Sequence, residues 1–175
     1  MDSLKHRLPA TIATERLVLT TPTLAHVPQM AALANNRAIY EVLSRLPHPY
    51  AESDGRFFVE HIARGDEEFA WAITSEGQFI GTIGLHLLPD QVPELGYWLG
   101  QPHWGFGYAT EAGRAVVAAA RAAGATALRS RALPTNTASR NVLGKLGFIE
   151  IGEEVDRQGT LEGQRMVLMR LEFDR

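Results

Sequence analysis

Residues 104–118 read Trp-Gly-Phe-Gly-Tyr-Ala-Thr-Glu-Ala-Gly-Arg-Ala-Val-Val-Ala, a glycine-spaced turn that runs directly into an alanine-rich stretch. Glycine lets the backbone turn tightly and approach a ligand closely. The N–H groups of a first helical turn have no partner inside the helix, and the helix dipole adds positive charge at the same end. The pattern predicts a phosphate- or pyrophosphate-binding loop at a helix start. Its predicted members are Trp104, Gly105, Phe106, Gly107, Tyr108, Ala109 and Thr110.

Other interpretations of this fragment need different residues. A turn that only starts a helix remains open for the fragment alone, because short glycine motifs match by chance. A dinucleotide-binding fold needs a third glycine where Thr110 stands and an acidic residue roughly 20 positions later, but residues 126–129 read Thr-Ala-Leu-Arg. A Walker loop needs Ser or Thr after Gly-Lys, and Gly144-Lys145 is followed by Leu146. Both nucleotide-binding alternatives are therefore disfavoured.

A second segment, residues 136–148, reads Asn-Thr-Ala-Ser-Arg-Asn-Val-Leu-Gly-Lys-Leu-Gly-Phe. Together with the loop it resembles the GNAT acyl-CoA N-acyltransferases, in the branch of ribosomal-protein N-terminal acetyltransferases (RimJ/RimL-like). The resemblance covers most of the chain, from Thr14-Glu15-Arg16-Leu17 to about Ile151. It also includes residues 46–50, 79–84 and 94–99. The superfamily loop often opens with Gln or Arg, whereas this chain has Trp104.

The resemblance implies that acetyl-CoA is the co-substrate and that its pyrophosphate lies on residues 104–110. Backbone amides do most of the phosphate binding in such loops, so Trp104 does not remove the site. In the resembling proteins the end of the preceding strand lends backbone groups to pantetheine and to the thioester carbonyl. That strand end corresponds to Leu99, with Gln101 nearby.

The segment from residue 136 adds further site residues. Asn136 and Ser139 stand at a predicted helix start, where capping is a sufficient structural role. By resemblance, Asn136 contacts CoA and Ser139 hydrogen-bonds or protonates the leaving sulfur. Many superfamily members use a tyrosine for the sulfur, but no tyrosine follows Tyr108 in this chain. Asn141 and Lys145 are added as CoA contacts, with a solvated face as the alternative for Lys145.

Glu94 is the candidate proton acceptor. It lies just upstream of the strand end that is expected to hold the thioester, and the resembling enzymes often carry an acid there. A structural carboxylate is the alternative. Acetylation needs a neutral amine, and this demand is modest for an α-amine with a reference pKa of about 7.7–8.0 but heavy for lysine at about 10.4. Glu94 and Ser139 are thus the predicted catalytic residues.

The hydrophobic pattern predicts an α/β (α+β) domain, and the resemblance implies that this is a single GNAT domain. We expect a mixed, mainly antiparallel, twisted sheet of about seven strands with helices on both faces. The expected strands are residues 15–20, 69–74, 78–87, 94–100, 126–133, 148–155 and 164–173, and the expected helices are residues 24–34, 37–44, 52–64, 108–123 and 136–146.

Length and composition bound the protein class. A chain of 175 residues suits one domain, residues 1–175. Residues 1–13 are expected to form an N-terminal extension of this domain. The net charge of −3 gives no positive field for direct binding of nucleic acid. There are no cysteines, which excludes an acyl-cysteine intermediate. No signal peptide or membrane span is expected, so the predicted location is cytoplasmic. A homodimer is a weak expectation.

The predicted function is direct transfer of acetyl from acetyl-CoA to a primary amine, either a protein N-terminus or a small molecule. One alternative is a self-protection enzyme that acetylates an antibiotic or a polyamine. Another is a non-catalytic domain that binds acyl-CoA. No metal is expected, because His48, His86 and His103 lack the paired spacing of a metal site.

Overall fold

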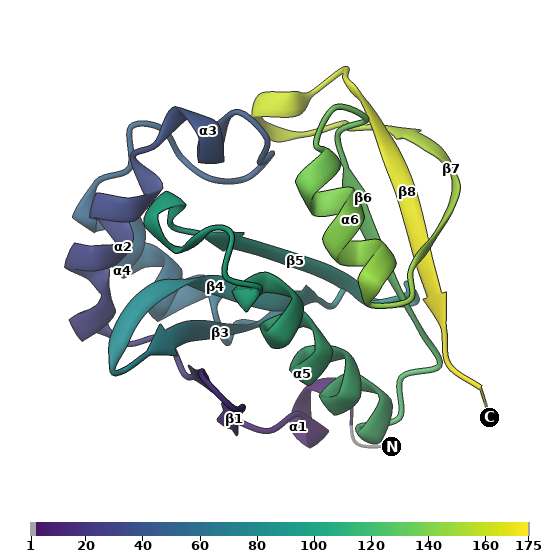
Figure 1. Ribbon diagram of the computed structural model, residues 1–175, viewed down its shortest axis with the longest axis horizontal. Helices are drawn as coiled ribbons and strands as arrows, with labels where there is room; N and C mark the ends of the chain where they lie inside the picture. The colour runs from purple at the N-terminus through teal and green to yellow at the C-terminus, as the bar shows by residue number, and fades with distance from the viewer. Residues whose placement is uncertain (1–2, 175) are drawn as a thin grey trace.

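Eight strands form one twisted sheet in the computed structural model, which describes residues 3–174 (Figure 1). The strands are β1 (Ile12–Ala13), β2 (Val18–Thr20), β3 (Glu68–Ser75), β4 (Gln78–His86), β5 (Glu94–Leu99), β6 (Ala127–Ala132), β7 (Ile149–Val155) and β8 (Arg165–Glu172). The helices are α1 (Leu4–Arg7), η1 (Leu24–His26), α2 (Val27–Ala34), α3 (Arg37–Tyr40), α4 (Glu52–Phe57), η2 (Phe58–Ile62), η3 (Gln101–His103), α5 (Tyr108–Ala122), α6 (Thr137–Lys145) and η4 (Gly159–Leu161).

The strand order is β1-β2-β3-β4-β5-β6-β8-β7, and every neighbouring pair is antiparallel except β5 and β6. The β3–β4 hairpin closes over Glu76 and Gly77, with φ of +50° and +79°. Two residues at positive φ are typical of the hairpin turn whose twist matches its strands. The parallel strands β5 and β6 share one register pair, Glu94 with Arg129. The fold is therefore two antiparallel halves that meet at a short parallel junction.

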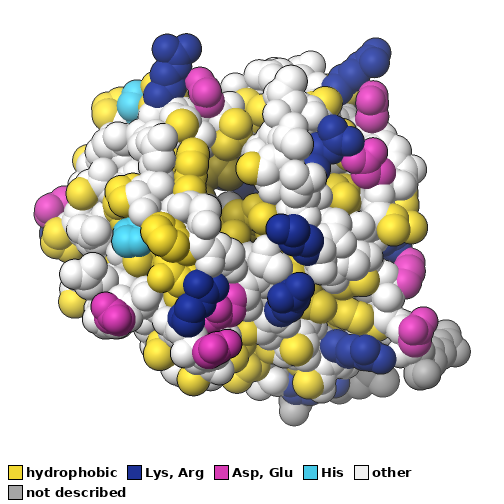
Figure 2. Space-filling view, in the orientation of Figure 1, with side chains coloured by type: hydrophobic (Ala, Val, Ile, Leu, Met, Phe, Trp, Pro, Cys, Tyr) yellow, Lys and Arg dark blue, Asp and Glu magenta, His cyan; other side chains and the backbone are white. Residues whose placement is uncertain are grey.

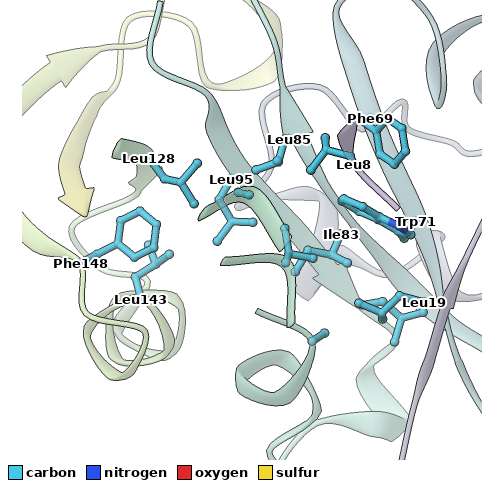
Figure 3. Close-up of a cluster of buried hydrophobic side chains, with 14 of the residues drawn as sticks. Leu8, Leu19, Phe69, Trp71, Ile83, Leu85, Leu95, Leu128, Leu143 and Phe148 are labelled. Carbon is cyan, nitrogen blue, oxygen red and sulfur yellow. The ribbon is translucent and has the colours of Figure 1, made fainter. Parts of the chain in front are cut away.

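One hydrophobic core lies between the sheet and helices α5 and α6 (Figure 3). Trp71, Ile83 and Leu95 come from neighbouring strands of the sheet, and Val116 comes from α5. Each of these side chains is at most 2% exposed. Leu143 of α6 extends the same core beneath β6. Burying one large apolar side chain contributes roughly 1.5–3 kcal/mol, so this core fixes α5 against the strands.

A second core covers the opposite face of the sheet. Met30 of α2 and Tyr50 pack with Phe79 and Trp98, which point to this face from β4 and β5. Trp98 follows Tyr97, which packs against the first core. This alternation is what an extended strand requires, and it confirms the prediction of helices on both faces of a mainly antiparallel sheet.

Three details differ from the sequence prediction. Residues 4–7 and 12–13 form α1 and β1, and the sheet has eight strands because β1 is added. Leu8 is buried and Trp71 Nε1 donates to the Pro9 carbonyl at 3.0 Å, so this part of the N-terminal extension belongs to the core. The helix expected at 37–44 ends at Tyr40, and the helix expected at 52–64 changes to a π-helix at Phe58. These short elements depend on tertiary contacts more than on periodicity.

Candidate functional site

A gap opens between β5 and β6 beyond their single register pair. The junction is held by Arg129 N–H, which donates to the Pro93 carbonyl at 2.9 Å, and by Ser130 Oγ, which donates to the Leu95 carbonyl at 2.7 Å. Backbone groups in a strand alternate between its two edges, so Tyr97 and Leu99 present theirs to the same side as Leu95. Since β6 pairs only with Glu94 within residues 3–174, this edge is left without a strand partner.

The glycine loop lies at the end of this edge and has the predicted conformation. Gly105 and Gly107 have φ of +83° and +78°, and Gly107 is the residue that precedes the first turn of α5. Within residues 3–174, no protein acceptor takes the backbone N–H groups of residues 105–110. Both glycines are exposed. The loop therefore offers a set of free donors at the positive end of a 15-residue helix, as an anion site requires.

Arg16 and Glu111 fix the loop from outside. Arg16 Nε lies 2.7 Å from Glu111 Oε1, and Arg16 Nη1 donates to the Phe106 carbonyl at 2.8 Å. Thr14 Oγ1 donates to Glu111 Oε2 at 2.6 Å. The guanidinium also covers the ring of Tyr108, 4.5 Å from its centroid. These contacts place a positive charge beside the loop.

This ion pair perturbs both partners. The hydrogen bond to Glu111 raises the pKa of Arg16. Burial alone would raise the pKa of Glu111, but hydrogen bonds from Thr14 and Arg16 hold it below its ordinary value. In the sequence, the Thr14–Leu17 segment contributes to the family resemblance, but it predicts no role for Arg16.

Side chains at the start of the loop join it to the strand. Trp104 Nε1 donates to the Leu99 carbonyl at 2.9 Å, although the indole remains 44% exposed. Gln101 Oε1 accepts from Asn36 Nδ2 at 2.6 Å. The predicted site residues Leu99, Gln101 and Trp104 are therefore close to one another, and Trp104 has a positioning contact that the sequence did not suggest.

The start of α6 lies beside the same gap. Asn136 Oδ1 accepts from the Ser139 N–H at 3.2 Å, which is the capping role considered as an alternative. Burial raises the pKa of Tyr97, and the neighbouring Ser139 side chain opposes this with a smaller lowering effect. Alternation along β5 predicted the face of Tyr97 but not this contact with α6. Tyr97 thus joins Ser139 as a hydroxyl donor at the gap.

The last two predicted CoA contacts lie further along α6. Asn141 and Lys145 are exposed. Lys145 lines a groove of about 520 Å³ between α5 and α6, with Arg114 and Phe173, and none of residues 104–110 lines that groove. The structure therefore places Lys145 on a solvated surface, the alternative raised from the sequence.

A cavity of about 730 Å³ opens on the face of the sheet opposite α5. Its floor includes Gly84 and Gly96, which lie opposite each other on β4 and β5. Apolar wall residues come from the α2–η2 region, among them Tyr50, Phe57 and Phe58. Figure 2 shows the other side of the molecule, the side that carries α5 and α6, where a hollow bordered by hydrophobic side chains lies near the centre of the view. The charged or titratable lining residues are Arg45, Tyr50, Asp54, His61, Asp66, Glu67, Glu68, His86, Glu94, Tyr97 and Arg131.

Glu94 lies on this cavity wall between two arginines. Its Oε1 accepts from Arg131 Nε at 3.2 Å, and its Oε2 lies 3.0 Å from Arg129 Nε. Arg131 also faces Asp156, with 3.7 Å between Nη1 and Oδ1. Burial alone would raise the pKa of Asp156, but hydrogen bonds from Ser44 and the Gln158 N–H, and the charge of Arg131, hold it low. The Glu94 carboxylate is thus one member of an ionic network, and its predicted role as proton acceptor stays a prediction.

An open sheet edge beside a glycine loop at a helix start, with an acid-lined cavity on the far face, is an arrangement that suits binding of an anionic ligand. The family model described as the acetyltransferase (GNAT) domain matches residues 16–149, so this chain belongs to the GNAT acetyltransferases. The family and the N-acetyltransferase activity predicted from the two sequence segments are confirmed.

Three solved acetyltransferase structures share the fold of this chain. The microcin C7 self-immunity acetyltransferase MccE, in complex with acetyl-CoA and AMP, is 17% identical with a TM-score of 0.81, over 95% of this chain and 98% of that one. The ribosomal L7/L12 α-N-protein acetyltransferase RimL, in complex with coenzyme A, is 16% identical with a TM-score of 0.81 and the same coverage. RimJ of Mycobacterium smegmatis is 18% identical with a TM-score of 0.74, over 95% of this chain and 84% of that one. No curated protein matches the chain by sequence.

Residues 3–174 contain no cluster of three or more His, Asp or Glu side chains that could hold a metal ion. Over the same residues, the helices are too short or too polar to cross a membrane.

Proposed function

We propose that this protein transfers an acetyl group from acetyl-CoA directly to a primary amine, either the α-amine of a protein N-terminus or a small molecule. The observation that carries the proposal is the position of the β5 edge. This edge runs from the free N–H groups of the glycine loop to the acid-lined cavity. A donor bound along the edge and an acceptor bound in the cavity would meet at Gly96 and Tyr97.

The donor side suits the chemistry of CoA. The free N–H groups of residues 105–110 bind the pyrophosphate, with Ala109 and Thr110 in the first turn of α5, where the dipole favours negative charge. The edge at Tyr97 and Leu99, which has no strand partner among the described residues, accommodates pantetheine, and its N–H groups polarise the thioester carbonyl. The Leu99 carbonyl itself already accepts from Trp104 Nε1. Asn136 and Asn141 are the side-chain contacts proposed for CoA. Lys145 keeps only a peripheral role.

The leaving sulfur lies near the start of α6 in this proposal. The Ser139 and Tyr97 side chains are neighbours there, so either hydroxyl can donate to the developing thiolate. The Tyr97 hydroxyl is protonated at neutral pH, because the ordinary pKa of tyrosine is about 10 and burial raises it further. The proposal therefore extends the predicted role of Ser139 to a hydroxyl pair.

The acceptor side favours a cationic amine that carries an apolar group. The carboxylates in the cavity attract an ammonium ion, and the aromatic wall of Tyr50, Phe57 and Phe58 binds an apolar neighbour. Both an N-terminal peptide and a compact amine meet this description. The likeness to RimL supports the first and the likeness to MccE supports the second. A homodimer in the cytoplasm remains part of the proposal, as does the absence of any direct contact with nucleic acid or a membrane.

The test is release of CoA thiol from acetyl-CoA in the presence of a panel of N-terminal peptides, polyamines and amine-bearing antibiotics. We expect saturable, amine-dependent release with one group of acceptors, and the acetylated product identified by mass spectrometry. Tight binding of acetyl-CoA without release for any acceptor would instead identify a non-catalytic acyl-CoA-binding domain.

A further inference from the structure

Three ionisable side chains stand in a row at one end of the sheet. Glu68 of β3 pairs with His86 of β4, and His86 pairs with Glu94 of β5. Residues directly opposite in antiparallel strands point to the same face, with Cβ atoms roughly 4.5–5.5 Å apart. All three line the cavity. The register thus brings a histidine between two carboxylates on the acceptor wall.

His86 is held by Glu68. The distance from His86 Nδ1 to Glu68 Oε2 is 3.1 Å, and the two side chains are 19% and 24% exposed. A carboxylate that accepts from Nδ1–H fixes the imidazole tautomer and leaves Nε2 with a free electron pair. The opposite strand is shaped for this contact, because a Cβ on Gly84 would lie 2.8 Å from Glu68 Oε1. Glycine at position 84 therefore leaves room for the carboxylate.

Glu94 is engaged differently. Both of its oxygens face guanidinium groups, those of Arg129 and Arg131. Oε1 accepts a hydrogen bond from Arg131 Nε, and Oε2 lies 3.0 Å from Arg129 Nε, which makes no hydrogen bond, so the carboxylate is held between two positive charges. His86 has no arginine partner among the described residues. From this contrast we propose that His86, oriented by Glu68, accepts the amine proton, while Glu94 acts as a fixed negative charge that attracts the ammonium ion. This inference rests on the proposed acetyltransferase function.

The proton balance of the step is complete. The bound ammonium gives one proton to His86 Nε2, and the neutral amine then attacks the thioester carbonyl carbon through its nitrogen lone pair. The C–S bond breaks, and sulfur leaves with the electron pair. The second nitrogen proton neutralises the thiolate by way of the Ser139–Tyr97 hydroxyls or water. His86 returns its proton to solvent before the next turnover.

The surroundings of His86 define its electrostatic setting. Glu68 flanks it on β3 and Glu94 on β5, with Arg129 and Arg131 of β6 beyond Glu94. The remaining charged or titratable groups on the same cavity are Arg45, Tyr50, Asp54, His61, Asp66, Glu67 and Tyr97. A general base acts only in its deprotonated form, so the pH–rate profile of the wild type should have an acidic limb.

The experiment compares pH–rate profiles of the wild type, His86→Gln, Glu68→Gln and Glu94→Gln with one identified acceptor. His86→Gln should lower kcat by about 10²-fold near neutral pH, within the usual range for general base catalysis. The acidic limb of the pH–rate profile of His86→Gln should follow only the ionisation of the amine. Glu68→Gln should shift that limb and lower kcat less, because it removes orientation and not the base. Glu94→Gln should mainly raise KM for the amine. His6→Gln, on the exposed surface of α1, is the matched control.

Affinity for acetyl-CoA, measured by calorimetry, should be unchanged in all four variants, and this shows that they are folded. A His86→Gln variant that keeps wild-type kcat and the wild-type acidic limb would overturn the assignment. So would a Glu94→Gln variant that alone loses the limb, because Glu94 would then be the base. A wild-type protein that acetylates no amine would overturn the proposed function itself, which is a different result.

Discussion

Replacing Gly107 by alanine should weaken acetyl-CoA binding by a calculable amount. Gly107 has φ of +78°, and the left-handed conformation costs a residue with a Cβ roughly 1–2 kcal/mol. No clash adds to this, since the nearest atom to a Cβ would be Arg16 Nη2 at 3.6 Å. The exposed loop can relax to negative φ when empty, and binding must then restore the left-handed form. A cost of about 1–2 kcal/mol corresponds to a Kd increase of roughly 5- to 30-fold.

Gly77→Ala is the matched control for this prediction. Gly77 has φ of +79°, with nothing within 4 Å of an added Cβ, and it lies in the β3–β4 turn. The strands hold that turn, so the same backbone cost should appear as a Tm decrease of about 2–8 °C with no change in Kd. Calorimetry with acetyl-CoA and thermal unfolding measure both quantities. A folded Gly107→Ala variant with wild-type Kd would refute the assignment of the loop.

Three further outcomes are expected. Asp156→Asn should lower the free energy of unfolding by roughly 1.5–3 kcal/mol at neutral pH. Because the folded pKa of Asp156 is depressed, urea titrations should show the difference fading as pH falls through and below about 3.9. Gly81→Ala, whose Cβ would lie 2.2 Å from the Trp98 carbonyl oxygen, should cost roughly 1–3 kcal/mol or more, whereas Gly96→Ala has nothing within 4 Å and should not. Asn136→Ala should mainly raise Kd for CoA, and Ser139→Ala should mainly lower kcat, as separate binding and turnover assays would show; equal small losses in both, with a lower Tm, would indicate simple capping.

Local features of the site were predictable because they depend on neighbours in sequence. Two glycines before an alanine-rich stretch require positive φ and a helix start, and both are present. Alternation along residues 94–99 predicted which side chains of β5 face each core. Capping by Asn136 follows from its place before α6. In each case the physical cause lies within a few residues.

Features that depend on strand register could not be read from the sequence. Arg16 reaches Glu111 and the Phe106 carbonyl only after β2 joins the sheet beside α5. The pairing of His86 with Glu68 depends on a hairpin register that shifts between Ile73 and Thr74. A lone histidine in a strand carries no signal of the carboxylate opposite it. The ion pairs of Glu94 with the arginines of β6 could not be predicted either, because they depend on which strands are neighbours in the sheet.

The most direct test of acetyl transfer across the β5 edge is a single-turnover experiment with acetyl-CoA that is isotopically labelled in the acetyl group. Enzyme in excess is mixed with an identified amine, quenched at successive times, and both protein and small molecules are analysed by mass spectrometry. Direct transfer predicts that label passes to the amine in step with release of one CoA per acetyl group, and that the protein never carries it. Label appearing first on the protein, or CoA released without acetylated amine, would contradict direct transfer.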